Sequence, residues 1–479
     1  MFTKENTLTL PLIIILYEAC FFNSRKYPAY KNGMFFLVLL PIIPVILFFA
    51  NSPTFTDIQK LFHQPITMKY YFLTQLRVML TYIKLLVFPF NQNLDYDYQI
   101  SKTLLDPYVI TSFLGLSIII LVSVRLLSRY RLIAFSVFWF FITLLPESSI
   151  IPLNDVISEH RLYLPMVGYS LFIVSGAYYL FRGKFFKGTI LLLSFLIFGY
   201  SIATYQRNRV WENELTLWSS VIKLSPNKAG PYVNLGIAFA NRQEYDKAIA
   251  DLNQAIRLNS NYAEAYNARG FVFIKKQEYD KAIADLNQAI RLVSNYVEAY
   301  NNRGIAFANR QEYDKAIADL NRVLKIDTNY IFAYTNLAKI YATIGNNTEA
   351  IALNKRLLAI DPYCSEAYNH MGVIYRALGR YKEAEANLKE AIRIKPDFRE
   401  AYSNLCATYG NEENFQQAIM SCYKALEGNP DNALAHFYLA VTYFHEKKYD
   451  LAIKHCDRAA ALGYEVDQSF LDQLKPYRK

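Results

Sequence analysis

Apolar residues follow two different patterns along this chain, and the change comes near residue 205. Before that point, apolar side chains form long runs that are separated by short charged loops. Beyond it, the long runs stop and the same apolar positions return at a fixed spacing. A membrane-spanning helix needs about 20 mostly apolar residues, and six segments of the first part reach or approach that length. These predicted spans are Leu8–Phe22, Gly33–Ala50, Leu105–Leu127, Leu132–Leu145, Leu162–Phe181 and Thr189–Tyr205.

A seventh apolar stretch, Met68–Phe90, also contains basic and polar residues. Loops rich in Lys and Arg stay in the cytoplasm, and three basic loops share one side only if this stretch does not cross. We therefore predict an interfacial or re-entrant amphipathic segment here. The loops 91–104 and 146–161 and all of 206–479 then lie outside the cytoplasm, but this topology fails if Met68–Phe90 spans. The basic loops contain Arg25, Lys26 and Lys31, then Arg125, Arg129 and Arg131, then Arg182, Lys184 and Lys187.

The part beyond residue 205 is an internal repeat. The dipeptide Ala-Tyr occurs five times, always 34 residues apart, and the segment QEYDKAIADLN occurs three times. Seven copies fill residues 229–466, a connecting half-copy precedes them over 206–228, and a cap or tail follows over 467–479. Such self-similarity at a fixed period is typical of solenoid proteins. The Ala-Tyr pairs begin at Ala265, Ala299, Ala333, Ala367 and Ala401.

The copies resemble the tetratricopeptide repeat, which the fifth copy shows with Tyr368, Gly372, Ala384 and Pro396. The resemblance implies two antiparallel helices per repeat, with small residues such as Gly372 allowing the helices to approach closely. Each pair stacks on its neighbours because no pair buries its apolar face alone. The fold class that we expect is all-α: a polytopic transmembrane helical domain over 1–205, followed by a tetratricopeptide-repeat α-solenoid.

A groove lined by the first helices is the usual place where such solenoids hold an extended peptide. A carboxamide offers both a donor and an acceptor, so a row of Asn residues along the groove could pair with a peptide backbone without reading its sequence. The alternative is that Asn is simply common at this position, or that recent duplication copied it. The position reads Asn234, Ala268, Asn302, Asn336, His370, Asn404 and Tyr438 along the seven copies.

Composition supports the division of the chain. Its 479 residues are 53% hydrophobic and only 19% charged, whereas a soluble protein carries about a quarter charged residues. Residues 1–205 contain 16 basic and 9 acidic residues, against 35 and 32 in the rest. These values exclude a single soluble domain and a disordered chain. The net charge of +10 lies mostly beside apolar segments, where it sets membrane orientation, and the repeats lack the single-sign stripe that a phosphate backbone needs. We therefore predict membrane lipid as a partner, a protein or peptide through the repeat groove, and no nucleic acid.

The second outer loop carries candidate chemistry. Charged groups at a membrane boundary are costly unless they are paired or used. Glu159, His160 and Arg161 are candidates for binding the phosphate of a lipid carrier, because a guanidinium offers a bidentate fork. The alternative is that Glu159 and Arg161 form only a structural ion pair.

Metal binding and disulfide formation receive little support from the sequence. Asp95 and Asp97 are weak candidates for a divalent cation, and Asp-x-Asp is also frequent in turns, so no metal centre is predicted. The five cysteines show no CxxC or metal-ligand spacing. Cys406, Cys422 and Cys456 fall on repeat positions that take small core residues, so we expect buried thiols.

Short motifs link the first residues to the repeats. They are Lys4-Glu5, a Phe-Pro before the loop with Asp95, Pro-x-Ser, Glu-x-Arg-Leu-Tyr-Leu-Pro-x-x-Gly from Glu159, and Arg207-Asn208-x-x-Trp211 leading to Leu217-Trp218. With these motifs the chain resembles the transmembrane and tetratricopeptide repeat-containing proteins and their bacterial relatives. That family is similar to lipid-phosphate-sugar-dependent O-mannosyltransferases of the C-type glycosyltransferase fold.

The resemblance implies that mannose passes from a polyprenyl-phosphate sugar donor to a protein hydroxyl, while the repeats present the acceptor on the non-cytoplasmic side of a bacterial inner membrane. In that family the catalytic acidic residues precede the Lys-Glu segment, and this sequence starts there. The usual catalytic carboxylates therefore cannot be assigned to any position of this sequence. We expect an N-terminally truncated relative, a chain that a separate polypeptide completes, or a relative that has lost the activity. Two hypotheses follow: a glycosyltransferase, or a non-enzymatic, membrane-anchored peptide-binding scaffold.

Overall fold

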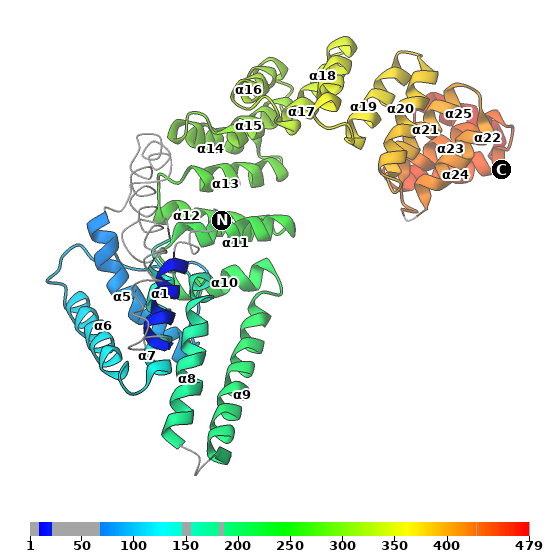
Figure 1. The fold of residues 1–479 in the computed structure, drawn as a ribbon. Helices are drawn as coiled ribbons and strands as arrows, with labels where there is room; N and C mark the ends of the chain where they lie inside the picture. The colour runs from blue at the N-terminus through cyan, green and yellow to red at the C-terminus, as the bar shows by residue number, and fades with distance from the viewer. Residues whose placement is uncertain (1–8, 22–67, 146–154, 182–185, 428, 479) are drawn as a thin grey trace. The chain divides into compact units, whose positions relative to one another are not determined.

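The computed structural model describes residues 9–21, 68–145, 155–181, 186–427 and 429–478, and every regular element in these ranges is a helix (Figure 1). The predicted all-α class is therefore confirmed for this part of the chain. The chain divides into two compact units, residues 1–260 and 261–479. The division falls inside the repeats, so the first repeat belongs to the first unit. The predicted domain boundaries at residues 205, 228 and 466 stay a prediction.

The first unit combines apolar helices with the first repeat. Its helices are α1 (Leu10–Phe21), α5 (Met68–Val87), α6 (Pro107–Leu126), α7 (Arg131–Leu144), α8 (Pro165–Phe181), α9 (Phe186–Val210), α10 (Glu214–Leu224), α11 (Ala229–Asn241) and α12 (Tyr245–Leu258), with the 3-10 turn η2 (Glu159–Leu162). Among the described residues, two helices are long and apolar enough to cross a membrane: α6, and α9 from Lys187 onward.

The other predicted spans are shorter helices or lie outside the described residues. Helices α1, α7 and α8 contain 12, 14 and 17 residues, less than the length of about 20 that a straight crossing needs. The predicted span Gly33–Ala50, the Lys4-Glu5 motif and several residues of the basic loops fall outside the described ranges. The polytopic membrane domain therefore stays a prediction.

Helix α5 forms from the stretch Met68–Phe90 and packs into the interior of the first unit. Val78 and Tyr82 are fully buried in a cluster that includes Phe140 of α7 and Leu162 of η2. The hydroxyl of Tyr82 donates to the backbone carbonyl of Ser158 and accepts from its N–H, at 3.0 Å each. Helix α5 thus holds Ile157 and η2 against α7. Its interfacial location at a membrane stays a prediction.

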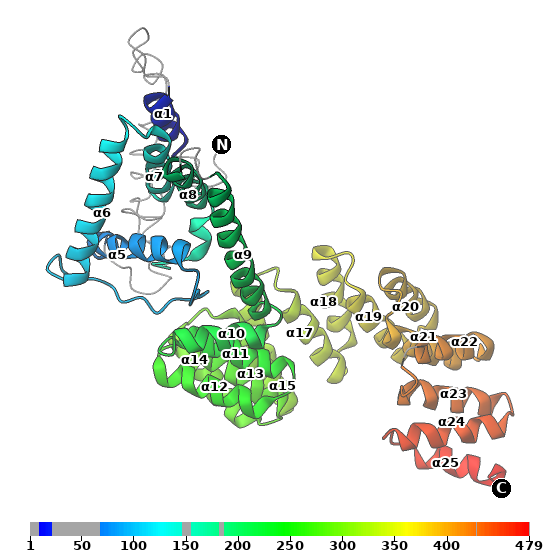
Figure 2. The same cartoon turned by 90° about the horizontal axis from the view of Figure 1, so that it is seen from below.

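The second unit is a run of antiparallel helix pairs, which Figures 1 and 2 show following one another. Its helices are α13 (Ala263–Lys275), α14 (Tyr279–Leu292), α15 (Val297–Asn309), α16 (Tyr313–Ile326), α17 (Ile331–Thr343), α18 (Asn347–Ile360), α19 (Ser365–Ala377), α20 (Tyr381–Ile394), α21 (Arg399–Asn411), α22 (Phe415–Leu426), α23 (Ala433–His445), α24 (Tyr449–Ala461) and α25 (Gln468–Leu474), with the turn η3 (Lys475–Tyr477). The predicted solenoid is confirmed. Helix α25 covers its end, because Leu474 is buried in the last core cluster.

Glycine at one position of the first helix allows close packing within a repeat. A Cβ atom added at Gly270 would lie 2.8 Å from Cγ of Leu286, and one at Gly372 would lie 2.5 Å from Cγ of Leu388. Both leucines are fully buried. The predicted close approach of the two helices is therefore confirmed, and the leucine occupies the space that a larger residue would need.

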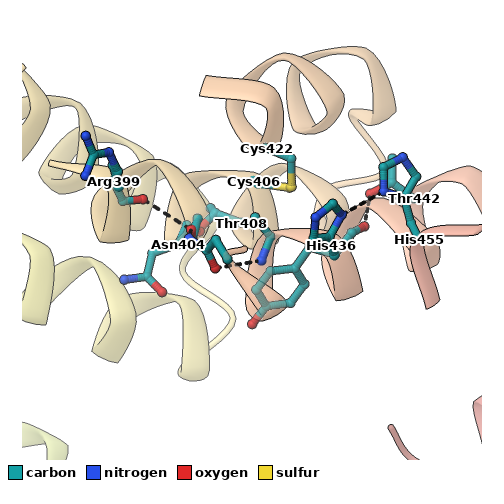
Figure 3. Close-up of a disulfide and its surroundings, with 12 residues drawn as sticks. Arg399, Asn404, Cys406, Thr408, Cys422, His436, Thr442 and His455 are labelled. Carbon is teal, nitrogen blue, oxygen red and sulfur yellow. Dashed lines mark hydrogen bonds between the residues drawn. A yellow bond between two sulfur atoms is a disulfide. The ribbon is translucent and has the colours of Figure 1, made fainter. Parts of the chain in front are cut away.

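The sixth repeat carries a disulfide at these same two positions. Cys406 and Cys422, which correspond to Gly372 and Leu388 of the preceding repeat, are bonded, with their Cα atoms 5.3 Å apart (Figure 3). The expectation of buried thiols is wrong for this pair, because these positions mark the closest approach of the two helices. The cysteines that remain free and buried are Cys20, Cys364 and Cys456.

The turn inside each repeat places one residue at positive φ. Glycine adopts this left-handed conformation readily, whereas other residues pay about 1–2 kcal/mol. The turn persists because the backbone closes it: the N–H groups of Gln277 and Glu278 donate to the carbonyls of Ile274 and Phe273. The residues are Gln243, Gln277, Gln311, Gly345, Gly379, Glu413 and Lys447, with φ between 59° and 81°.

Candidate functional site

One carboxylate ties the loop that follows α5 to the 3-10 turn η2 that precedes α8. Oε1 of Glu159 accepts a hydrogen bond from the backbone N–H of Asn93 at 2.7 Å and another from the hydroxyl of Tyr96 at 2.5 Å. Asn93 and Tyr96 belong to the loop after α5, while Glu159 begins η2. The recorded hydrogen bonds of Glu159 are therefore those of a loop anchor. Its role toward a lipid phosphate stays a prediction.

Burial controls the protonation of this anchor. It raises the pKa of Glu159 above its ordinary value, and the hydrogen bonds from Tyr96 and Asn93 and the charge of Arg207 oppose that rise. Burial, followed by the contact with Glu159, also raises the pKa of Tyr96. The phenol consequently keeps its proton and remains the donor, and Glu159 is the group of this pair that can change its charge.

Ser225 holds the same loop from another direction. Its Oγ accepts hydrogen bonds from the side-chain amide of Asn93 at 2.7 Å and from the N–H of Asp97 at 2.9 Å. It donates to the backbone carbonyl of Asp95 at 2.8 Å. One hydroxyl thus uses its full capacity of one donor and two acceptors. Since Ser225 follows α10, the loop is attached both to η2 and to the helix that leads into the repeats.

The weak metal candidates belong to this attached loop. The carboxylate of Asp95 forms an ion pair with Lys228, and the backbone of Asp97 is held by Ser225. Within the described ranges, no group of three or more His, Cys, Asp or Glu side chains is placed to hold a metal ion. The contacts of Asp95 are therefore those of a structural ion pair.

The two basic candidates of the second outer loop differ in exposure. Arg161 is only 7% exposed, and its guanidinium donates to the backbone carbonyls of Asp155 at 2.7 Å and Val156 at 3.3 Å. His160 is exposed, and its Nδ1 pairs with Oγ of Ser158 at 2.7 Å. Both side chains thus stabilise the turn that carries them. Their binding of a lipid phosphate stays a prediction.

A basic residue outside the candidates predicted from the sequence lies at a cavity. Arg207 lines a cavity of about 340 Å³ and an adjoining one of about 270 Å³. Its guanidinium carbon lies 5.9 Å from the centre of the Trp211 ring. The signal was present as the Arg207-Asn208-x-x-Trp211 motif, but spacing alone could not show that a cavity forms beside it.

The row of Asn residues in the repeats forms bridges between neighbouring repeats. The side-chain amide of Asn302 donates to Oδ1 of Asn267 at 3.0 Å, and that of Asn336 donates to Oδ1 of Asn301 at 3.0 Å. Asn404 repeats the bond to an equivalent Asn at 2.9 Å. One N–H of each predicted residue is therefore engaged. Asn302 and Asn336 are half-buried, whereas Asn404 is almost fully buried.

The remaining candidates of this row lack such a bridge. Asn302, Asn336 and Asn404 each bond to an Asn of the preceding repeat, whereas the residue at that position for His370 is Thr335. The Nδ1 atom of His370 is buried without a partner among the described residues. Burial, aided by the charge of Lys339, lowers the pKa of His370 to about 4. Asn234 is half-buried on α11. Peptide binding by these residues stays a prediction.

A histidine pair in the seventh repeat is a further feature that spacing did not reveal (Figure 3). Nδ1 of His436 lies 2.9 Å from Nδ1 of His455, and Nε2 of His436 lies 2.9 Å from the carbonyl of Pro430. Since a carbonyl only accepts, Nε2 carries the proton and Nδ1 of His436 accepts from His455. Burial and the neighbouring His436 lower the pKa of His455 to about 4. The pair joins α23 to α24.

Known repeat families match most of the second unit and part of the first repeat. The family described as TPR repeat matches residues 238–277 and 272–311. Families described as tetratricopeptide repeat match residues 297–330, 330–397 and 411–465. The chain therefore contains tetratricopeptide repeats, as the sequence pattern predicted.

Part of the chain is similar to curated O-mannosyl-transferases. Protein O-mannosyl-transferase TMTC3 of Homo sapiens is 31% identical over 113 residues, which is 23% of this chain and 12% of that protein. Protein O-mannosyl-transferase Tmtc2 of Drosophila melanogaster is 35% identical over 114 residues, again 23% of this chain and 12% of that protein. The matched segment thus spans a small part of either relative.

Solved structures share partial likeness with the chain. YrrB, described as a TPR protein with an unusual peptide-binding site, is 24% identical and has a TM-score of 0.31, covering 38% of this chain and 95% of its own. The APC/C hetero-tetramer Cut9-Hcn1 is 19% identical and has a TM-score of 0.46, covering 55% of this chain and 52% of its own.

Proposed function

We propose that this tetratricopeptide-repeat protein is anchored in a membrane with its repeats outside the cytoplasm. The first helix of each repeat contributes to a surface that holds a protein acceptor, and mannose is transferred to that acceptor from a lipid-phosphate sugar. The observation that carries the proposal is the row of carboxamides at Asn302 and Asn336. After bridging to the next repeat, each still offers an oxygen and one N–H that bond to no described residue. Similarity to O-mannosyl-transferases supports mannose as the transferred group.

The disulfide supports the proposed location of the repeats on the non-cytoplasmic side of the membrane. Disulfides persist in oxidising compartments and are rare in the reducing cytosol, and Cys406–Cys422 lies within the repeats. A location of the repeats outside the cytoplasm is therefore consistent with the disulfide that they contain. The α6 and α9 helices supply apolar lengths sufficient for anchoring.

The compartment is tested by thiol labelling of the full chain produced in cells. The cells are lysed in denaturant, one sample is reduced and the other is not, and both are then treated with a maleimide. The labelled cysteine peptides of the two samples are compared. We expect Cys406 and Cys422 to react only after reduction, and Cys456 to react in both samples. Full labelling of Cys406 and Cys422 without reduction would place the array in a reducing compartment and contradict the proposal.

Acceptor capture is tested by substitution on the first helices. The double variant Asn302→Ala/Asn336→Ala of the full chain should recover at least tenfold less of a crosslinked protein partner, because two backbone-pairing groups are lost. Asn321→Ala is the matched control, since Asn321 is an exposed carboxamide on the second helix α16. Equal capture by the double variant and the control would contradict the assignment of this face.

The alternative is a membrane-anchored scaffold that binds the same protein without transferring a sugar. One observation favours it: two acidic side chains of these loops are engaged, Glu159 with Tyr96 and Asp95 with Lys228. Incubation of the full chain with a prenyl-phosphate mannose and the captured protein separates the two functions. Mannose on the captured protein supports the transferase, and capture without mannose supports the scaffold.

A further inference from the structure

Two adjoining cavities lie beside the C-terminal part of α9 in the first unit. Their volumes are about 340 Å³ and 270 Å³, and both are lined by Pro89, Gln92, Ala203 and Arg207. Glu159, which anchors the outer loops, lines neither cavity. The space is therefore separate from the hydrogen-bonded anchor and available for a ligand.

The wall of the larger cavity is built from three elements that hold one another in place. The hydroxyl of Tyr200 on α9 donates to the carbonyl of Leu86 on α5 at 3.0 Å. A phenol has one proton, so Tyr200 must accept from the hydroxyl of Tyr169 on α8, 2.9 Å away. Leu85, Leu86 and Met166 add apolar surface to this wall. The cavity is thus pre-formed and largely apolar beside a polar end.

Arg207 is the charged residue among those that line the larger cavity. Its guanidinium is half-buried and lies over the ring of Trp211. In the described part of the chain, no hydrogen bond or ion pair engages it, and the carboxylate of Glu159 is already occupied by two donors. A guanidinium in this state offers a planar fork that suits a phosphate.

The face of α9 that bears Arg207 is apolar along the rest of its length. Leu193, Leu196, Tyr200, Ala203 and Arg207 follow one another at alternating spacings of three and four residues, which places them on one side of a helix. From Lys187 the helix is long and apolar enough to cross a membrane. An apolar path therefore ends at Arg207, and Lys223 adds a second positive charge to the lining of the adjoining cavity.

We propose that the Arg207 cavity binds the phosphate of a lipid-phosphate donor, with the lipid chain along α8 and α9. A free anion would leave the apolar path unused. A neutral lipid would leave Arg207 with the charge of Glu159 alone, and that carboxylate is bonded to Asn93 and Tyr96 and forms no ion pair with the guanidinium among the described residues. A phosphate on a long apolar chain fits both features. The inference rests on the proposed function, because it names where the sugar donor is held.

Binding of farnesyl phosphate to the full chain in detergent micelles tests this site. Intrinsic tryptophan fluorescence reports binding without any need for catalysis, because Trp211, one of the three tryptophans, has its ring centre 5.9 Å from the guanidinium carbon. We expect Arg207→Gln to weaken binding at least tenfold and Arg207→Lys to retain part of it, because charge remains but the planar fork is lost. Arg209→Gln is the matched control: it removes the same charge two residues away, at an exposed position that lines neither cavity.

Competing ligands distinguish a prenyl phosphate from free phosphate and from an ordinary phospholipid. Farnesol and inorganic phosphate should each bind at least tenfold more weakly than farnesyl phosphate, and excess phosphatidylglycerol should not displace it. If farnesol bound as tightly as farnesyl phosphate, the phosphate charge would not contribute to binding and the proposal would fail. Displacement by phosphatidylglycerol would instead indicate a site for ordinary lipid headgroups and would also contradict it. Wild-type affinity in Arg207→Gln, with an unchanged circular dichroism spectrum, would overturn the proposal.

Failure of this site and failure of the proposed function give different results. Farnesyl phosphate binding needs no protein acceptor, and acceptor capture by the repeats needs no lipid. If Arg207→Gln binds normally while Asn302→Ala/Asn336→Ala loses capture, only the cavity assignment fails. If the cavity variant loses binding but the repeat variant captures normally, the lipid site stands and the acceptor face fails.

Discussion

The repeats and the outer-loop anchor use polar contacts of very different range. In the repeats, Arg269 donates two hydrogen bonds of 2.7 Å to Asp285, and Arg303 does the same to Asp319, always 16 residues away. In the first unit, Asn93 instead contacts Glu159 and Ser225, which lie 66 and 132 residues away. A contact that recurs at short range is visible in the sequence pattern, whereas a contact that occurs once at long range is visible only in the fold.

Apolar side chains differ between the two regions in the same way. Leu286 and Leu320 of the repeats are fully buried, whereas Leu191 and Phe195 of α9 are 73% and 72% exposed. Burying a leucine side chain contributes about 1.5–3 kcal/mol, so the repeats gain stability from their own packing. The apolar surface of α9 has no such packing, which suits a helix surrounded by lipid.

The largest expected effect concerns a half-buried ion pair of the repeats. Asp319→Ala should reduce the free energy of local unfolding of α15 and α16 by about 3 kcal/mol, because the charge of Arg303 is left without its partner. Hydrogen exchange of the full chain measures this value. Glu312→Gln, which alters an exposed pair with Lys315, should show no measurable change. Equal protection in both variants would remove the distinction between buried and exposed pairs.

A smaller effect tests packing in the two regions directly. Gly372→Val should destabilise the fifth repeat by about 2 kcal/mol, because the added atoms overlap with Leu388. Gly199→Val on α9 should change stability by less than about 0.5 kcal/mol, since a Cβ there meets nothing within 4 Å. Thermal unfolding of both full-length variants makes the comparison. A loss in Gly199→Val as large as that in Gly372→Val would show that α9 is packed as tightly as a repeat.

The turn inside the repeats predicts a small gain in stability. Gln277 has φ of 62°, so Gln277→Gly should stabilise the second repeat by about 0.5 kcal/mol, since the relief of strain exceeds the extra entropy of the unfolded chain. Gly379→Gln, at the equivalent turn of the fifth repeat, should lose a similar amount. Hydrogen exchange of the adjoining helices measures both. Changes of the same sign in the two variants would contradict a shared turn geometry.

The smallest expected effect is a pH slope at the outer-loop anchor. Because burial raises the folded-state pKa of Glu159, its contribution to stability is fully present below the ordinary pKa of Glu and is lost as the pH rises through the raised value. Protection of the loop 91–98 should therefore fall across that window in the wild type but stay level in Glu159→Gln. Asp155→Asn, at an exposed site four residues before Glu159, should keep the wild-type slope. A slope in Glu159→Gln equal to the wild-type slope would contradict this account.

The sequence predicted side-chain contacts correctly inside the repeats, where the same residue types recur at the same helical positions. The close contact of Gly372 with Leu388 could be expected, because four of the seven copies place Gly on the first helix and Leu on the second helix at these positions. The same register placed Cys406 and Cys422 opposite each other, yet their type alone suggested buried thiols. Spacing identified the positions, but only the distance between the two helices showed that the sulfurs meet.

The sequence by itself determined the repeat solenoid, its register and the apolar character of the first part. These follow from helical periodicity and from contacts between residues that are close along the chain. The tertiary structure alone decided that Glu159 and Ser225 hold the loop after α5, that Arg161 donates to the backbone carbonyls of Asp155 and Val156, and that Arg207 borders a cavity. Such contacts depend on how distant segments pack, and no local pattern of residue types encodes that packing.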